Sequence, residues 1–225
     1  MSLSHADESV EVAGFVLAGG ESSRMGQDKA LLTFAGRPLI AHALAVLKDA
    51  GLQPAIAGAR NALSSFAPVV EDPPANAGKG PLSGICAALR STSARLAVFV
   101  PIDLPFIPYS LIAYLVFHAL VTGSPVTVSS INGRTQTFPA VIERSALDFL
   151  EGQLNSGVWG CFAAYLHAAE SLASRLSILP AEPLVQSGQI VHPASLPPAI
   201  WFLNLNSPRD LMHAERFANS GLRVS

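Results

Sequence analysis

The chain has 225 residues, of which 50% are hydrophobic and 13% are charged, and its formal net charge at pH 7 is -2. An average soluble domain carries roughly 25% charged residues, so this composition predicts a large buried core around a sheet covered on both faces. The sequence has no basic patch or basic tail, which argues against a general nucleic-acid or membrane-surface binder.

In the first half of the chain, strand-like and helix-like segments alternate. Strands are predicted at residues 10–18, 53–58, 66–70 and 95–103, and helices at 37–51, 81–91 and 108–120. This alternation indicates βαβ units with right-handed crossovers. We therefore predict an α/β fold with a Rossmann-like, mostly parallel central sheet flanked by helices.

The second half has a different pattern. Asn132-Gly133 lies between two β-rich runs and indicates a β-hairpin, a small antiparallel addition in the C-terminal half. The other elements predicted are helices at 143–154 and 158–169, a Pro-rich loop at 176–199 and a strand at 200–204. A last helix is predicted after Ser207, because Ser207 and Asp210 have the spacing of a capping box around Pro208.

No repeat and no linker divides the chain, so we predict a flexible tail over 1–11 and a single domain over 12–219. The first dozen residues are polar and acidic, unlike a signal or transit peptide. The most apolar stretch, 110–120, is too short to span a bilayer. Cys86 and Cys161 lack metal-site spacing, and we expect free buried thiols in a reducing compartment. These features predict a cytoplasmic protein.

The stretch "LAGGESSRMGQDKALL", residues 17–32, carries the main chemical signal. Glycines at the end of a strand let backbone N–H groups approach a ligand, and such groups cradle phosphates. Arg24 and Lys29 add two cations to the same loop, at the sheet edge where α/β proteins bind ligands. Neither the dinucleotide-binding nor the Walker A glycine spacing is present. The residues alone favour a phosphate-binding loop, with a flexible Gly-Ser surface loop as the alternative.

The same stretch resembles the signature of the nucleotidyltransferases and, among them, of the molybdenum cofactor guanylyltransferase family. That signature is LAGG, a short variable run, R-M-G-x-D-K and an apolar pair. The matching residues are Leu17, Ala18, Gly19, Gly20, Arg24, Met25, Gly26, Asp28 and Lys29. Three segments resemble further family motifs in the same order: 70–89 (Asp, spacer, G-P-L-x-G), 98–107 (a strand ending in Asp before Pro) and 202–211 (N-x-N-[ST]-P-x-[DE]-L).

The resemblance implies transfer of GMP from GTP to the terminal phosphate of molybdopterin, with Mg²⁺ and release of pyrophosphate. It implies two catalytic residues: Lys29 at the α-phosphate and the transition state, and Arg24 at the β- and γ-phosphates. Asp103 would bind Mg²⁺, which takes few protein carboxylates. Asp28 would orient Lys29 or its loop. The plainer alternatives are a solvated lysine and a turn aspartate.

The nucleotide itself would be held by a wider set of residues. Backbone groups of the LAGG residues would contact it, namely Leu17, Ala18, Gly19 and Gly20. Asp72 would accept hydrogen bonds from guanine or ribose, with an ordinary turn as the alternative. The residues implied to shape the base pocket are Gly80, Pro81, Leu82 and Gly84. Residues 12–115 would thus form a nucleotide-binding half.

Residues 116–219 would form the acceptor-binding half, where the resemblance is thinner. Asn206 would be a second metal ligand or an acceptor contact, with a loop-stabilising role as the alternative. Gln136 and Arg134 would line the acceptor site. Basic residues expected around a pterin phosphate are absent from 155–167, so molybdopterin, a sugar phosphate and another phosphorylated acceptor all stay open.

Two other functions remain open from the sequence. One is a cytidylyltransferase or sugar-phosphate nucleotidylyltransferase, and the other is a nucleotide-binding protein without catalysis. Arg24, Lys29 and Asp103 together argue against the second. The low charge content predicts an apolar patch, used for homo-oligomer formation or for transient contact with an enzyme that accepts the cofactor.

Overall fold

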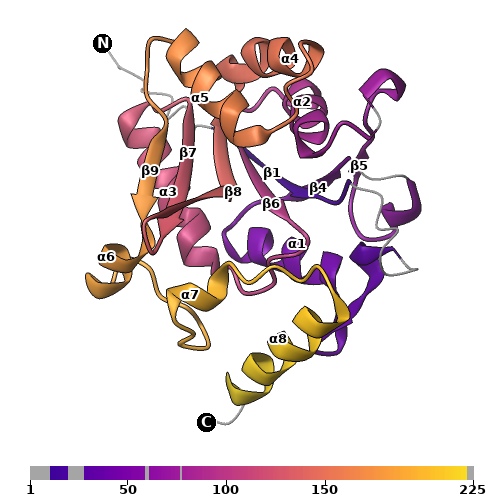
Figure 1. Cartoon of the computed structure of the whole chain (residues 1–225), viewed down its shortest axis with the longest axis vertical. Coiled ribbons are helices and arrows are strands. Elements are labelled where there is room, and N and C mark those ends of the chain that lie inside the picture. The colour runs from indigo at the N-terminus through magenta and orange to yellow at the C-terminus, as the bar shows by residue number, and fades with distance from the viewer. Residues whose placement is uncertain (1–10, 20–27, 59–60, 77, 222–225) are drawn as a thin grey trace, which may run out of the picture.

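A computed structural model describes residues 11–19, 28–58, 61–76 and 78–221 (Figure 1). Within these residues, seven strands form one sheet in the order β5-β4-β1-β6-β8-β7-β9. Their bounds are Val12–Leu17 (β1), Pro54–Ala57 (β4), Val69–Val70 (β5), Leu96–Pro101 (β6), Val126–Ile131 (β7), Arg134–Glu143 (β8) and Ser177–Pro180 (β9). A separate two-stranded antiparallel sheet pairs β2 (Thr33–Phe34) with β3 (Arg37–Pro38).

The helices connect these strands. Their bounds are Leu39–Asp49 (α1), Pro81–Ser91 (α2), Tyr109–Thr122 (α3), Leu147–Asn155 (α4), Cys161–Ser171 (α5), Ala181–Gln186 (α6), Pro198–Trp201 (α7) and Pro208–Gly221 (α8). Short 3-10 turns occupy Lys29–Leu31, Asn61–Leu63, Pro74–Asn76 and Arg144–Ala146. None of the helices among the described residues is both long and apolar enough to cross a membrane.

The central strand β1 pairs in parallel with β4 on one side and with β6 on the other. Strand β8 is antiparallel to both β6 and β7, and β9 is parallel to β7 at the edge. The predicted α/β fold class, a mostly parallel sheet flanked by helices, is confirmed. The hairpin at Asn132-Gly133 joins β7 to β8, and both residues have the positive φ that this tight turn requires, 49° and 70°.

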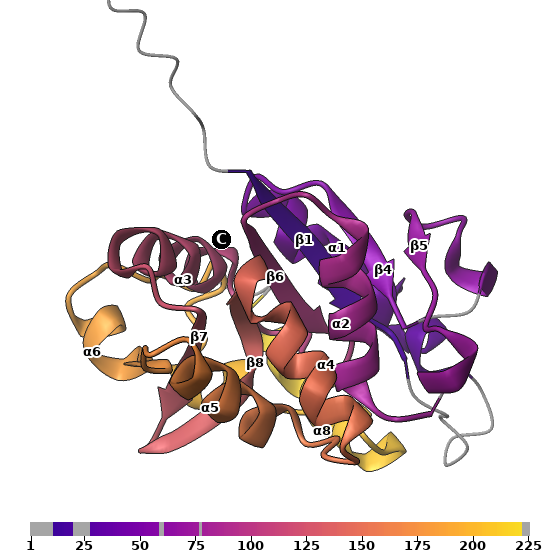
Figure 2. The ribbon, with the colours of Figure 1, turned by 90° about the horizontal axis from the view of Figure 1, so that it is seen from above.

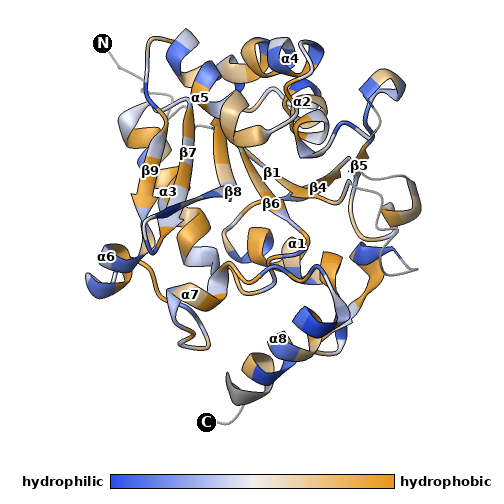
Figure 3. Ribbon diagram, in the orientation of Figure 1, coloured by the Kyte–Doolittle hydropathy of each residue, from blue (hydrophilic) through white to orange (hydrophobic). Residues whose placement is uncertain are grey.

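Two hydrophobic layers cover the two faces of the sheet, because side chains alternate along each strand. In β1, Val16 packs in a cluster with residues of α1 and α3, whereas Phe15 packs with residues of α2, α4 and α5. The views in Figures 1 and 2 show these two helical layers on either side of the sheet. The strands of the core are predominantly hydrophobic in Figure 3.

Cys86 and Cys161 are both free and buried, as predicted. Burial raises the pKa of each thiol to about 12. Both are therefore protonated at neutral pH and are poor nucleophiles.

Two of the sequence predictions for the second half are wrong. Residues 176–199 are not one loop, since Ser177–Pro180 extend the sheet as β9 and Ala181–Gln186 form α6. Residues 200–204 contain no strand, because Pro198 begins the short helix α7 and Trp201 is buried with its Nε1–H donated to the Leu196 carbonyl at 2.8 Å. Tertiary packing of the indole outweighs the β propensity of this run.

An apolar groove lies between the end of α1 and the outer side of α3. It has a volume of about 250 Å³ and is lined by Ala50, Leu52, Ile112, Ala113, Val116, Phe117 and Leu120. Phe117 and Val121 are exposed beside it. The exposed apolar surface expected from the composition is thus present, and its use in self-association stays a prediction.

Candidate active site

The parallel strands β1, β4, β5 and β6 end at the same edge of the sheet. From β1 the chain builds outward through β4 to β5, and β6 then returns on the other side of β1. In open α/β sheets such a change of direction leaves a crevice outside the carboxyl ends of the strands. Asp72 follows β5 and Asp103 follows β6, so two predicted site residues lie at this edge.

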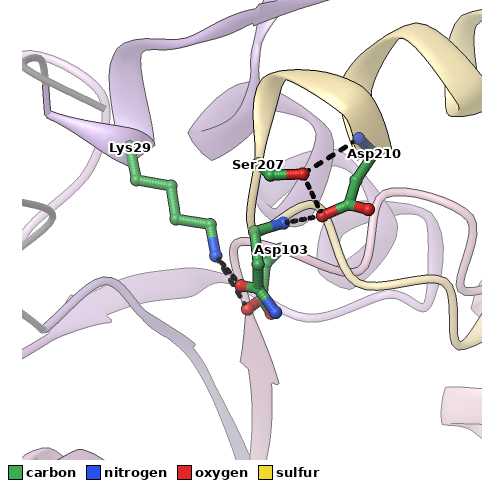
Figure 4. Close-up of polar contacts among 5 residues, drawn as sticks. Lys29, Asp103, Ser207 and Asp210 are labelled. Atoms are coloured by element: carbon green, nitrogen blue, oxygen red, sulfur yellow. Dashed lines mark hydrogen bonds and ion pairs between the residues drawn. The ribbon is translucent and has the colours of Figure 1, made fainter. Parts of the chain in front are cut away.

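The centre of the site is the ammonium group of Lys29 (Figure 4). Lys29 Nζ donates to Asp103 Oδ2 at 3.0 Å and to Asn206 Oδ1 at 2.6 Å. These partners lie 74 and 177 positions away in the sequence. The Lys29 and Asp103 side chains are 18% and 22% exposed, so the ion pair is largely buried. The fold thus brings together three groups that the sequence had singled out: the Lys29 ammonium, the Asp103 carboxylate and the Asn206 amide.

Local structure presents Lys29 to these partners. Lys29 begins a 3-10 turn, and the Asp28 carboxylate caps that turn by accepting the Ala30 N–H at 3.0 Å. Ala30 is fully buried and anchors the turn to the core. Asp28 thus caps the turn that carries Lys29, and its role in orienting Lys29 stays a prediction.

The loop that carries Asn206 is tied directly to the loop that carries Asp103. The Leu205 N–H donates to the Asp103 carbonyl at 3.0 Å, and Leu205 is buried in a cluster with Phe34, Phe106 and Ala214. Phe106 lies just after Asp103, and Ala214 belongs to α8. Packing of α8 against the segment after β6 therefore brings Asn206 to Lys29.

A second group of residues lies around the ends of β1 and β4. A Cβ on Gly19 would be 2.7 Å from the Gly58 carbonyl oxygen, so the two loops touch through their backbones. Gly58 itself has φ of +74° and lies beside Asp72, whose Oδ1 would be 3.7 Å from a Cβ on Gly58. Only glycine allows the close backbone contact at position 19 and readily adopts the positive φ at position 58.

Asp72 supplies a buried acceptor oxygen beside the Ser83 hydroxyl. Neither Asp72 Oδ1 nor Ser83 Oγ has a partner of hydrogen-bond geometry in the part of the chain that the structure describes. Burial raises the pKa of Asp72, and the Ser83 hydroxyl, which is close enough to interact with the carboxyl group, partly opposes this rise. A buried acceptor without a partner is costly in a folded protein, which marks this position as one that a ligand donor would satisfy.

The other predicted nucleotide contacts are arranged in different ways. Gly80, with φ of +78°, is the N-cap of α2, and Pro81 is its first residue. Gly84 would place a Cβ 3.4 Å from the Gly58 N atom. Leu17 and Leu82 are buried in the core. Ala18 donates its N–H to the Ala57 carbonyl at 3.0 Å. Gly20 and Arg24 lie outside the described residues.

The predicted acceptor residues lie on β8. Since β8 is antiparallel to β6 and pairs Ala140 with Phe99, its first residues extend past the carboxyl end of β6. Gln136 is on this extension, and its Nε2 donates to the Arg134 carbonyl at 3.0 Å. The extension therefore runs toward the edge that carries Asp103.

The donor set at this edge fits a magnesium ion. No cluster of three or more His, Cys, Asp or Glu side chains occurs among the described residues. Mg²⁺ does not need one, since it keeps water and substrate phosphates as most of its ligands. Asp103 Oδ2 and Asn206 Oδ1 already meet at one cation, the Lys29 ammonium. One carboxylate oxygen and one amide oxygen at this edge are hard ligands of the kind that this ion prefers.

Sequence reasoning missed three residues that shape the site. Gly58 follows β4 much as Gly19 follows β1. This position after a strand was the signal from which Gly58 could have been identified in the sequence. Ser83 is the variable residue of G-P-L-x-G and gave no signal of its own. Asp210 was expected only as a helix cap, yet its carboxylate accepts the N–H of Asn206 at 3.1 Å.

The family profile of the MobA-like NTP transferase domain matches residues 14–170. The chain belongs to this family. The molybdenum cofactor guanylyltransferase of Rhizobium johnstonii is 31% identical over 211 residues, which cover 92% of each chain. That of Xanthomonas euvesicatoria is 41% identical over 104 residues, which cover 45% of this chain and 52% of the relative. The family predicted from the sequence signature is confirmed.

A solved structure agrees at the level of the fold. The molybdopterin-guanine dinucleotide biosynthesis protein A of Archaeoglobus fulgidus superimposes with a TM-score of 0.74 at 24% identity, covering 92% of this chain and 99% of that one. This MobA-like protein is therefore a nucleotidyltransferase with the α/β fold of its family.

Proposed function

We propose that this MobA-like protein transfers GMP from GTP to the terminal phosphate of molybdopterin and releases pyrophosphate. The observation that carries the proposal is the meeting of Lys29, Asp103 and Asn206 within 3.0 Å at the carboxyl edge of the sheet. The names of the relatives, which cover this chain almost completely, support the same reaction.

The reaction forms one bond and breaks one. An oxygen of the acceptor phosphate attacks the α-phosphorus of GTP, and the bond from that phosphorus to the bridging oxygen of the β-phosphate breaks. Pyrophosphate leaves with the electron pair. Charge builds up on the transferred phosphoryl group and the leaving oxygen, so positioned cations lower the barrier without covalent participation of the protein.

Each residue has a distinct task in this proposal. Lys29 turns from Asp103 toward the α-phosphate, and Arg24 holds the β- and γ-phosphates. Asp103 and Asn206 would hold Mg²⁺, which would neutralise charge at the phosphates when bound. The Gly19 and Gly20 backbones hold the phosphates at close range, and Gln136 and Arg134 contact the acceptor.

The choice of guanine rests on Asp72. Guanine presents two neighbouring donors, N1–H and the exocyclic amino group, to one carboxylate. Cytosine offers only its amino group and uracil only one ring N–H on that edge. The buried Asp72 Oδ1, which has no partner among the described residues, supports a ligand donor at this position, from guanine or from ribose.

The two halves of the chain are assigned to different substrates. We assign the nucleotide to residues 12–115 and the acceptor to 116–219, with one exception. Asn206 belongs to the second half by sequence, but its amide oxygen contacts Lys29 of the first. It is therefore placed to meet both substrates.

Incubation of the protein with GTP, Mg²⁺ and molybdopterin, followed by mass spectrometry, tests the proposal. We expect the guanine dinucleotide form of the cofactor and one pyrophosphate per product. Lys29→Ala and Asp103→Ala should each lower turnover by about 10²-fold or more, the size expected for losing a preorganised charge. Lys48→Ala and Asp49→Ala, on the exposed end of α1, are the matched controls.

The alternatives give different results in the same experiments. Thermal stabilisation by CTP or UTP rather than GTP would indicate a cytidylyltransferase or a sugar-phosphate nucleotidylyltransferase. Stabilisation by GTP with no pyrophosphate release from any phosphorylated acceptor would indicate a binding protein without catalysis. Either result would overturn the proposed reaction.

A further inference from the structure

We propose that Asp210 is a positioning residue, which holds the Asn206 amide against Lys29 through the Asn206 backbone. The contact network itself does not depend on the substrate. The kinetic consequence rests on the function proposed above.

Asn206 lies in a loop between a buried anchor and a helix. On one side Leu205 is buried and donates its N–H to the Asp103 carbonyl. On the other side α8 begins at Pro208. The Asn206 residue itself is held by two contacts: its N–H donates to Asp210 Oδ2 at 3.1 Å, and its Oδ1 accepts from Lys29 Nζ at 2.6 Å.

The capping arrangement at α8 differs from the usual one. In a capping box, the acidic residue in the first turn accepts the N–H of the N-cap residue itself. Here the N-cap Ser207 bonds in the usual way, its Oγ accepting the Asp210 N–H at 3.2 Å. The Asp210 carboxylate also accepts from the Ser207 backbone and, beyond the usual box, accepts the N–H of the preceding residue, Asn206, at 3.1 Å. The box is thus extended by one residue toward the active site (Figure 4).

This extension links the helix cap to the residue that contacts Lys29. The Ser207 hydroxyl satisfies the backbone of the helix and also donates to Asp210 Oδ2 at 2.8 Å. The Asp210 carboxylate satisfies the residue that contacts Lys29. These hydrogen bonds, above all that from Ser207, hold the pKa of Asp210 below its usual range. The carboxylate therefore remains an acceptor throughout the neutral pH range.

The positioning effect has a physical basis in the geometry of Lys29. Its side chain is long and flexible, so its ammonium group is located by the oxygens that receive it. If the Asn206 N–H loses its acceptor, the loop is free to rotate and the amide oxygen moves. Displacements of about 1 Å in such groups lower rates by as much as about 10²-fold.

Two substitutions distinguish positioning from capping. Asp210→Ala removes the carboxylate but keeps the Ser207 Oγ bond to the backbone N–H of position 210. Ser207→Ala removes that cap but keeps the carboxylate for Asn206. We expect Asp210→Ala to lower kcat about tenfold, with less than about threefold change in KM for GTP. Ser207→Ala should lower the melting temperature at least as much, with kcat within about twofold of wild type.

Rescue and coupling provide the decisive measurements. Asp210→Asn keeps an acceptor oxygen at the same reach and should recover most of the lost kcat. In an Asn206→Ala background, Asp210→Ala should have no further effect, because a residue that acts through Asn206 cannot act without it. Equal effects of Asp210→Ala with and without Asn206, or kcat losses that follow the melting temperature in both single variants, would overturn the proposal.

A readout without catalysis keeps this test independent of the proposed reaction. In the free protein, the rate at which an amine-acylating reagent labels Lys29 can be measured by mass spectrometry, with the exposed Lys48 as internal reference. Asp210→Ala should raise the relative labelling of Lys29 several-fold, and Ser207→Ala should not. Unchanged Lys29 labelling in Asp210→Ala would contradict the positioning role even if GMP transfer is confirmed. The expected labelling would support it even if GMP transfer fails.

Discussion

At the scale of single residues, Lys29 occupies a position that two proposed metal ligands share. Its ammonium group is 3.0 Å from Asp103 Oδ2 and 2.6 Å from Asn206 Oδ1. A divalent ion held by the same two oxygens would lie close to this positive charge. Like charges at such distances repel strongly in a partly buried site. We therefore predict that the lysine would compete with a metal at this site until a bound triphosphate drew the ammonium group away.

The free protein should accordingly bind a divalent ion weakly, and Lys29→Met should bind it more tightly. We expect a gain of about tenfold in Mn²⁺ affinity without nucleotide, because one positive charge is removed from the site. Electron paramagnetic resonance of free Mn²⁺ measures this directly. Lys48→Met is the control for net charge, and unchanged or weaker Mn²⁺ binding by Lys29→Met would contradict the competition.

For Asp72, the pH range that favours a stable fold differs from the range that favours its proposed contact with the nucleotide. Burial raises the pKa of its carboxyl group. At low pH the group is protonated in both the folded and the unfolded chain. As pH rises through the unfolded and then the folded pKa, the unfolded chain releases its proton first, so the free energy of unfolding falls. The loss is complete above the folded pKa, whereas the proposed acceptance of two guanine donors by one carboxyl group would need the ionised form.

Asp72→Asn should therefore gain stability relative to wild type as pH rises. Denaturant unfolding between about pH 4 and about pH 8 measures the difference, which should grow across the range that includes the raised pKa. GTP affinity should change in the other sense: that of wild type falls as pH is lowered through this pKa, and that of Asp72→Asn is low throughout. A stability difference that is constant with pH would show that the ionisation of Asp72 is not its source.

At the scale of elements, the loops after β1 and β4 are held together by backbone contact. The Gly58 N–H donates to the Val70 carbonyl at 3.1 Å, and Gly58 in turn abuts Gly19. This contact links the ends of three strands. It leaves no room for a Cβ on Gly19, since the atom that it would meet is a backbone oxygen.

Glycine-to-alanine substitutions should therefore have opposite effects at two positions. Gly19→Ala should destabilise the protein by about 1–3 kcal/mol and weaken nucleotide binding, because backbone must move. Gly152→Ala, within α4 where nothing lies within 4 Å of a Cβ, should stabilise it by about 0.5–1 kcal/mol. Calorimetric melting with and without GTP compares the two variants, and normal GTP binding by Gly19→Ala would argue against the close approach.

At the scale of the whole molecule, a small third hydrophobic cluster joins three distant parts of the chain. It contains Phe34 of β2, Phe106 of the loop after β6, and residues of α8. The Phe34 and Phe106 rings meet edge to face at 5.4 Å, and Phe106 meets Phe217 at 6.4 Å. In Figure 1, α8 lies outside the two helical layers, and Figure 3 shows hydrophilic and hydrophobic residues alternating along it. This cluster, and not the sheet, brings Asn206 to the site.

Phe106→Leu should thus affect catalysis more than an equally buried core substitution does. We expect Phe106→Leu and Phe99→Leu each to lower stability by about 1–2 kcal/mol. Phe99 is fully buried in the cluster beneath α2 and α4. Only Phe106→Leu should speed amide hydrogen exchange in α8 and lower kcat. Equal exchange of α8 in the two variants would contradict the assignment of this cluster to the site.

The amino-acid sequence by itself determined the features that depend on local patterns. Strand and helix periodicity predicted the α/β sheet, Asn132-Gly133 predicted the hairpin, and the spacing of Ser207 and Asp210 predicted the start of α8. The residues of the signature at 17–32 lie close together in the chain, and Asp103 stands in a short motif of its own. Each motif could therefore be recognised from the sequence. Such features follow from short-range sterics and hydrogen bonding, which act over a few residues.

Only the tertiary structure decided which distant groups meet. The contact of Lys29 with Asn206 spans 177 positions, and the pairing of β9 with β7 and the burial of Trp201 also depend on packing between remote segments. No local periodicity encodes such contacts, because their stability comes from hydrophobic surface that the whole fold buries at once. The extended capping box at Asp210 combines both kinds of information: its spacing is local, but its contact with Asn206 matters only because the fold brings Asn206 to Lys29.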